Sequence, residues 1–319
     1  MASRTKPVAL IIGASRGIGR QIAIDLAKNN YTVIIAAKST TTTKETNQTP
    51  IDPNSPTSTI TTVAHEINTT HGPNTALPIP VDVRSAAQID NLIAQTLAMT
   101  NGRLDVVVYN AGAIWWSSVR NTPLKRFRLL QQVNPEGLYA TLQAVLPVFE
   151  RNGDRGRIVV VSPPVYSRFF RGKVGYAVGK VGMSVLTKGL AMDFVREGKT
   201  EMAITSVWPA AAIQSAATEM NPAANDASRS KADLRKPTIF SDAILGILNT
   251  PPHIVNGMLA LDEDFLRDYC GVTDFSGYAV VPGTNPRRMM PKTLPVLEVE
   301  EQDDEGVRMD SAKRGGSKL

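Results

Sequence analysis

The chain has 319 residues, 42% of them hydrophobic, and a formal net charge of +6. This composition excludes a wholly disordered protein, which combines low hydrophobicity with high net charge. No apolar run approaches the roughly 20 residues of a membrane span. A single cysteine excludes internal disulfides and cysteine-based metal cages, and three scattered histidines predict no metal site.

The excess of positive charge has two interpretations. Nucleic-acid binders carry basic stripes interleaved with aromatic residues, whereas here the positive residues are dispersed and only 6% of residues are aromatic. We therefore expect no nucleic-acid partner. The charge fits either a field that attracts a phosphorylated small molecule or an ordinary solvated surface.

Strand-like and helix-like patterns alternate along the chain. Apolar β-rich runs predict strands at 8–12, 31–37, 77–83, 104–109, 157–161, 202–208 and 255–260. Helical patterns lie between them, at about 17–29, 60–67, 85–100, 124–150, 175–196 and 238–248. Repeated strand–helix units predict a doubly wound α/β fold, with one parallel sheet of about seven strands.

We expect residues 1–285 to form one domain and residues 286–319 to form a charged, mobile tail. Six acids lie between Glu298 and Glu305, which is typical of a solvated segment. The chain ends in Ser-Lys-Leu at 317–319, a tripeptide read by the peroxisomal import receptor. This predicts a peroxisomal protein with that receptor as a partner; an accidental terminus is the alternative.

A glycine-rich turn at 13–19 joins the first strand to the first helix. Gly13 permits a tight turn, Gly17 lets the backbone approach a pyrophosphate, and Gly19 permits close packing of helix on strand. The helix N-terminus adds free amides and a positive dipole end. The alternative is a purely structural turn. The predicted cofactor contacts in this turn are Gly13, Ser15, Arg16, Gly17, Ile18 and Gly19.

The spacing Gly-x-x-x-Gly-x-Gly resembles that of the short-chain dehydrogenase/reductase family, and four further motifs of that family follow in order over roughly residues 6–262. The resemblance implies a Rossmann fold, a nicotinamide cofactor and a small carbonyl or alcohol substrate, and it allows a homo-oligomer. Within the family, a subgroup with an added C-terminal sterol-carrier domain is the most similar; we do not expect that domain here. The further motifs are Asp82-Val83, Asn110-Ala111-Gly112, Ser162 and Tyr176-x-x-x-Lys180.

The resemblance also implies roles for four catalytic residues. Ser162 would bond the substrate oxygen, Lys180 would hold the nicotinamide ribose, and Asn134 would support a water beside the lysine. Tyr176 has an ordinary pKa of about 10, and a lysine one helical turn away favours its phenolate, so it can act as general acid or base. Without the resemblance, such a pair is usually just a helix surface. Pro135 predicts a kink in its helix.

The remaining cofactor contacts follow from the same resemblance. Asp82 and Val83 would touch the adenine, and Asn110, Ala111 and Gly112 would line the cofactor, together with Tyr176 and Lys180. After the sixth strand the chain reads Trp-Pro-Ala-Ala at 208–211 where family members often have Pro-Gly, so Ala212 or Ile213 is the candidate for the nicotinamide amide. Tyr109 stands where an asparagine is common.

Cofactor choice is predicted from the end of the second strand. An NAD site usually has an acid there, but Lys38 and Ser39 follow the strand and no acid comes before Glu45. With Arg16 nearby, this predicts NADP(H); solvated surface charges are the alternative.

The predicted function is reversible hydride transfer between NADP(H) and a carbonyl or secondary alcohol, with lipid-derived or acyl substrates favoured by the peroxisomal signal. The alternatives are a carbonyl reductase of a secondary metabolite and a catalytically silent nucleotide-binding protein. Arg168, Arg171 and Lys173 surround a Phe pair between the catalytic serine and tyrosine. They suggest an anionic, partly apolar substrate such as an acyl-CoA, or else a solvated loop.

Overall fold

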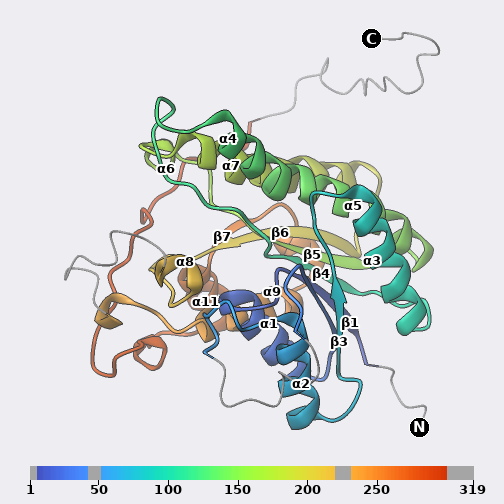
Figure 1. The fold of residues 1–319 in the computed structure, drawn as a ribbon. Helices are drawn as coiled ribbons and strands as arrows, with labels where there is room; N and C mark the ends of the chain where they lie inside the picture. The colour runs from blue at the N-terminus through green and yellow to red at the C-terminus, as the bar shows by residue number, and fades with distance from the viewer. Residues whose placement is uncertain (1–5, 42–51, 220–230, 300–319) are drawn as a thin grey trace.

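The computed structural model describes residues 6–41, 52–219 and 231–299. Within them, one seven-stranded sheet has the order β3-β2-β1-β4-β5-β6-β7, and all neighbouring strands are parallel (Figure 1). The predicted doubly wound fold and strand number are confirmed. The strands are β1 (Val8–Ile12), β2 (Thr32–Ala37), β3 (Ala76–Pro80), β4 (Val106–Tyr109), β5 (Gly156–Val161), β6 (Met202–Trp208) and β7 (Leu259–Leu261).

Helices cover both faces of the sheet. Figure 1 shows α3, α4, α5 and α7 above the sheet and α1, α2, α9 and α11 below it. The helices are α1 (Gly17–Lys28), α2 (Ile60–His71), α3 (Ala86–Met99), α4 (Leu124–Gln131), α5 (Gly137–Arg151), α6 (Ser167–Phe170), α7 (Val174–Arg196), α8 (Ala216–Glu219), α9 (Thr238–Asn249), α10 (Pro252–Val255) and α11 (Asp262–Cys270), with short 3₁₀ turns η4 (Lys231–Asp233) and η5 (Ser276–Tyr278).

The central strands are buried on both faces because each face carries its own core. Every residue of β1 is buried. Ala9 and Ile11 pack into the cluster formed with α1, α2 and α9, whereas Leu10 and Ile12 pack into the cluster formed with α3, α5 and α7. This alternation explains why the strand reads as a continuous apolar run.

Two predicted strand boundaries are wrong. β3 ends at Pro80, so Asp82 and Val83 follow the strand instead of lying within it. The prediction of a strand at 255–260 fails in its first half, because Pro252 begins α10 and Gly257 then turns the chain with a φ of +76°. Proline fits the first turn of a helix, where no amide partner is needed.

The break predicted at Pro135 takes the form of a π-helical turn, η1 (Gln132–Glu136), between α4 and α5. The Gly137 amide donates to the Gln132 carbonyl, five residues back. A proline has no amide to donate, so the wider turn lets the helix continue past it. The turn places Asn134 in the interior, with no exposed surface.

The segment 286–299, the described part of the predicted tail, contacts the domain. Arg288 forms a bidentate ion pair with Asp264 on α11. The amides of Met289 and Met290 both donate to the Ala210 carbonyl, in the segment after β6. The peroxisomal tripeptide at 317–319 lies outside the described residues. In the part of the chain that the structure describes, no helix has the length and apolarity to cross a bilayer.

Candidate active site

The glycine turn lies where the strand order changes direction, between β1 and its neighbours β2 and β4. Ligands of open parallel sheets bind at this switch point. Gly13 has a φ of +92°, and a Cβ there would lie 2.6 Å from the Ala111 amide nitrogen. A Cβ on Gly19 would overlap the Gly13 carbonyl oxygen, which accepts a 2.8 Å hydrogen bond from Asn110 Nδ2. Both positions therefore require glycine. The structure places the predicted residues Gly13 and Gly19 in contact with Asn110 and Ala111.

The first turn of α1 has no side-chain cap, so its amides can take other acceptors. The Gly17 amide donates a 2.9 Å hydrogen bond to the Pro53 carbonyl, in the connection before α2. The buried Ser15 is held through its carbonyl, which accepts a 2.6 Å bond from Ser58 Oγ. The Ile18 amide bonds to no other described residue. This turn therefore keeps an amide for a phosphate oxygen.

Three charged side chains meet beyond the ends of β2 and β3. Lys38 Nζ lies 3.0 Å from Asp82 Oδ2, and Arg84 bonds the same carboxylate through two nitrogens. The hydrogen bonds from Arg84, and then from Lys38, hold the pKa of Asp82 well below its ordinary range. Arg16 forms no ion pair with any described residue. With two cations on one acid, the cluster retains positive charge.

Three of the predicted catalytic side chains lie at the carboxyl end of β5 or on α7. Ser162 directly follows the strand, is fully buried, and has no partner for its Oγ among the described residues. Tyr176 and Lys180 are buried one turn apart on α7. Lys180 Nζ donates a 2.8 Å hydrogen bond to the Val161 carbonyl, next to Ser162. A buried hydroxyl without a partner is suited to bind an oxygen of a ligand.

Burial acts in opposite directions on the two ionisable groups of this helix. It raises the pKa of the Tyr176 hydroxyl and lowers the pKa of Lys180 to about 7. Both shifts arise because a low-dielectric environment disfavours the charged form. In the ligand-free protein Tyr176 is therefore protonated and ready to donate, and Lys180 changes charge near neutral pH.

Asn134 connects this group to the end of β4. Its Oδ1 accepts a 3.0 Å hydrogen bond from the Ala113 amide, and its Nδ2 donates a 3.2 Å bond to the Ala113 carbonyl. A Cβ on Gly112 would lie 3.2 Å from Lys180 Nζ and 3.3 Å from Asn134 Oδ1. The absence of a side chain at Gly112 thus leaves space beside both polar atoms.

Tyr109 is a supporting residue whose role the sequence did not reveal. It is fully buried at the end of β4, and its hydroxyl donates a 2.7 Å hydrogen bond to the Val133 carbonyl in the π-helical turn. A Cβ on Gly137 would overlap this hydroxyl. Tyr109 therefore bonds the turn that carries Asn134, which gives a physical reason for the tyrosine in place of the family's common asparagine.

The segment after β6 is held by a buried carboxylate that the sequence also did not single out. Asp262 Oδ1 accepts hydrogen bonds of 2.8 Å from the Ala210 amide and 2.7 Å from the Glu263 amide. Burial raises the pKa of Asp262 to about 7. Ile213 is 3% exposed and its side chain belongs to the core, so only its backbone can contact a cofactor.

Aromatic rings surround the catalytic tyrosine. The rings of Trp116 and Phe169 each lie 6.2 Å from the Tyr176 ring, centroid to centroid, and Trp208 lies 5.9 Å from Phe169. Lys173 Nζ lies 4.0 Å from the centre of the Phe169 ring. The segment between Ser162 and Tyr176 thus forms, with Trp116 and Trp208, an aromatic wall with a cation in it.

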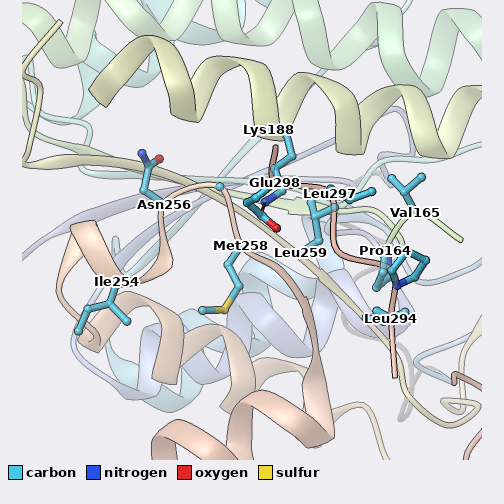
Figure 2. A pocket seen from close by; sticks show the side chains of 12 residues that line it. Pro164, Val165, Lys188, Ile254, Asn256, Met258, Leu259, Leu294, Leu297 and Glu298 are labelled. Atoms are coloured by element: carbon cyan, nitrogen blue, oxygen red, sulfur yellow. Dashed lines mark hydrogen bonds and ion pairs between the residues drawn. The ribbon is translucent and has the colours of Figure 1, made fainter. Parts of the chain in front are cut away.

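A separate hollow of about 340 Å³ is lined in part by the segment that follows Ser162. Figure 2 shows Pro164 and Val165 near Leu294 at one end of it, and Asn256 and Ile254 at the other end. None of the predicted catalytic side chains lines it. Its lining includes residues both from the segment that follows Ser162 and from the C-terminal segment 294–298.

The residues at the switch point fit a nicotinamide dinucleotide. The glycines at 13 and 19 leave a cradle that a Cβ would fill, and the Ile18 amide can take a phosphate oxygen. After β5, the buried Ser162 hydroxyl has no partner among the described residues. This arrangement provides phosphate binding at one end and binding of a reactive oxygen at the other.

The sequence is similar to those of known proteins. A family model described as short chain dehydrogenase matches residues 7–227. Hydroxysteroid dehydrogenase-like protein 2 from Mus musculus is 35% identical over 275 residues, which are 86% of this chain and 51% of that protein. The chain thus spans about half the length of this curated relative.

Solved structures share the fold. A short chain dehydrogenase from Mycobacterium thermoresistibile has a TM-score of 0.73 and 32% identity, covering 88% of this chain and 93% of that one. An alcohol dehydrogenase from Thermococcus sibiricus, complexed with 5-hydroxy-NADP, has a TM-score of 0.62 and 23% identity, covering 80% of this chain and 95% of that one. Since the family model also matches more than half of the sequence, the chain belongs to the short-chain dehydrogenase/reductase family of oxidoreductases.

Proposed function

We propose that the protein is an NADP(H)-dependent oxidoreductase that interconverts a carbonyl and a secondary alcohol on a lipid-derived or acyl substrate in the peroxisome. The observation that carries the proposal is the buried group of Ser162, Tyr176 and Lys180 at the carboxyl end of β5, with the Ser162 hydroxyl lacking a partner among the described residues.

Residues of the chain supply and remove the proton that is transferred to or from the substrate oxygen. Ser162 donates a hydrogen bond to the substrate oxygen, and Tyr176 gives that oxygen its proton in reduction or takes it in oxidation. Lys180 in its charged form stabilises the tyrosinate that remains. When bound, the nicotinamide supplies or accepts the hydride. Candidates to hold its ribose and amide are Lys180 and the backbone at Ile213.

The preference for NADP(H) is supported by the charge beyond β2. Lys38 is 62% exposed in its side chain and shares Asp82 with Arg84, so its ammonium remains accessible to a phosphate. Arg16 has no ion pair with a described residue. A hydrogen bond to a charged group contributes about 1.5–3 kcal/mol, which is tenfold or more in affinity.

Calorimetric titration of NADPH and NADH tests this choice. We expect NADPH to bind at least tenfold tighter, and Lys38→Asp to shrink or reverse the ratio because it removes a cation and adds repulsion. Equal affinities in the wild type would contradict the preference.

Turnover and localisation test the rest. Purified protein with NADPH and a panel of fatty-acyl, steroid and quinone carbonyls should lose absorbance of the reduced cofactor with at least one class. Cofactor binding without turnover on any of them would favour the silent nucleotide-binding alternative.

A fluorescent protein fused to the N-terminus should co-localise with a peroxisomal marker, and deletion of residues 317–319 should leave it diffuse. A full-length fusion that is already diffuse would contradict the peroxisomal address.

A further inference from the structure

The ammonium of Lys173 lies inside a cage of three aromatic rings, which we call the Lys173 cage. Its Nζ is 4.0 Å from the ring centre of Phe169, 5.7 Å from that of Trp116 and 5.9 Å from that of Tyr176. The side chain is half-buried, and burial lowers the pKa of Lys173 without a contribution from any charged neighbour. A cation is thus held against the ring of the catalytic tyrosine.

The stretches of sequence that form the Lys173 cage contain no acid. The chain has no Asp or Glu between Asp154 and Asp193, the stretch that contains Phe169, Lys173 and Tyr176. It also has none between 105 and 136, the stretch that contains Trp116. Among the described residues, Lys173 forms no ion pair. Partly desolvated cations in proteins are usually paired, so an unpaired one beside the reacting group indicates that a ligand supplies the anion.

The position of Lys173 in the fold adds to its need for an anion. It directly precedes α7, a helix of 23 residues, and provides no side-chain cap. A cation at a helix N-terminus is disfavoured by the positive end of the helix dipole. An anion near the Lys173 ammonium would therefore interact favourably with both the side chain and the helix.

Two further donors without acceptors lie on this side of the site. Ser162 Oγ and Trp115 Nε1 are buried and have no partner within the described parts of the chain. Trp115 packs against the cluster that contains Phe169 and Tyr176. Buried donors are nearly always paired, so these atoms also call for oxygen acceptors from a ligand. A ligand that pairs with Lys173 and with these two donors has at least two oxygen-bearing groups, one of them anionic.

We propose that the Lys173 cage is the anion subsite of the substrate pocket, and that the substrate is an oxo acid or the matching hydroxy acid. Its carboxylate binds Lys173 while its carbonyl meets Ser162 and Tyr176. The inference rests on the proposed oxidoreductase function. Lys173 Nζ lies close to the Tyr176 ring, so the carboxylate and the carbonyl are separated by only a few bonds. The phosphates of an acyl-CoA, which lie far from its thioester, do not fit this subsite.

Matched acids and esters provide the kinetic test. Oxodecanoic acids with the ketone at successive positions, and their methyl esters, are compared in the wild type, Lys173→Met and Lys173→Arg. Methionine keeps an apolar stem against Phe169 and removes the charge. We expect the acid-to-ester ratio of kcat/KM to fall at least tenfold in Lys173→Met and to be largely retained in Lys173→Arg. Lys188→Met, within α7 and outside the cage, should leave the ratio unchanged.

A binding test needs no turnover. Tryptophan fluorescence reports on the cage through Trp116, and decanoate and decanamide differ in charge but hardly in size. Decanoate should bind wild type at least tenfold more tightly than it binds Lys173→Met, whereas decanamide should not distinguish them. Equal binding of decanoate and decanamide to the wild type would overturn the anion subsite. Turnover of esters without any preference for acids would overturn it too, while leaving the oxidoreductase function intact. Binding of decanoate through Lys173 without turnover of any carbonyl would instead contradict the oxidoreductase function.

Discussion

The cofactor end and the substrate end of the site are formed by different types of residue. At the cofactor end, the backbone of the glycine turn lies close to the residues after β4, and the Asn110 side chain bonds the Gly13 carbonyl; glycines permit this close approach. At the substrate end, large aromatic side chains and the Lys173 ammonium form the surface. The glycine turn thus depends on positions that have no side chain, whereas the substrate end depends on large side chains.

This difference decides how each end responds to substitution. Adding one methyl group at the cofactor end displaces backbone, whereas exchanging a ring or a charge at the substrate end changes one contact and leaves the fold in place. Cofactor binding should therefore respond to added side-chain volume in the glycine turn, and turnover should respond to the loss of a hydroxyl or a charge at the substrate end. Four substitutions examine this contrast.

Tyr176→Phe should have the largest effect. It removes the transferable proton and retains the ring that packs against Phe169. General acid–base catalysis is typically worth 10²–10⁴-fold, so kcat should fall by about that factor while NADPH affinity stays near wild type. Steady-state kinetics and calorimetry measure the two quantities; wild-type turnover in this variant would refute the role of Tyr176.

Lys180→Met should increase stability of the cofactor-free protein in a pH-dependent way. Burial lowers the folded-state pKa of Lys180 from 10.5 to about 7, so between these values the unfolded chain holds a proton that the folded chain lacks. Wild-type stability should thus rise with pH across this window, and the burial penalty is complete below pH 7.

The gain from Lys180→Met should accordingly be largest near pH 6, on the order of 3 kcal/mol, since each pKa unit is worth roughly 1.4 kcal/mol and one hydrogen bond is lost. It should fade as the pH approaches 10. Urea unfolding at several pH values measures it, with the exposed Lys28→Met as control. A gain that is the same at all pH values would show that the charge of Lys180 is not responsible.

Gly19→Ala examines the shape requirement at the cofactor end. Its Cβ would overlap the Gly13 carbonyl and crowd Asn110 Nδ2, which forces α1 away from the sheet. We expect a loss of about 1–3 kcal/mol in stability and at least tenfold weaker NADPH binding. Gly189→Ala is the matched control: its Cβ meets nothing within 4 Å in the helix α7, so it should stabilise by about 0.5–1 kcal/mol. Equal effects of the two substitutions would argue against a close-packed cradle.

Tyr109→Phe should have the smallest combined effect of the four, because it removes one hydrogen bond and changes no predicted contact with substrate or cofactor. The ring stays, but the Val133 carbonyl loses its 2.7 Å hydrogen bond, at a cost of about 1–3 kcal/mol. Because this carbonyl precedes Asn134, kcat should fall more than the affinity for NADPH. The exposed Tyr139→Phe on α5 serves as control. If both substitutions are neutral in thermal unfolding, Tyr109 does not support the π-helical turn.

The same contrast explains what could be predicted from the sequence. The glycine turn, Asn110 and Ser162 could be predicted because each directly follows a strand, and Tyr176 because Lys180 lies one helical turn away from it. The support from Tyr109 and Asp262 was not, since each acts on backbone that is distant in the sequence. The start of the last strand could not be predicted because the apolar pattern begins at Val255, inside α10, and the Gly257 turn separates it from β7.

The hydrogen bond from the Gly17 amide to the Pro53 carbonyl has a consequence for the kinetics of cofactor association. A phosphate that takes this amide must first displace the carbonyl, so binding includes a unimolecular rearrangement of the connection before α2. The observed association rate would then level off at high cofactor concentration instead of rising linearly. Release of the cofactor would follow the return of Pro53 to the same amide, which couples the exchange of cofactor to a motion of the polypeptide and not to diffusion alone.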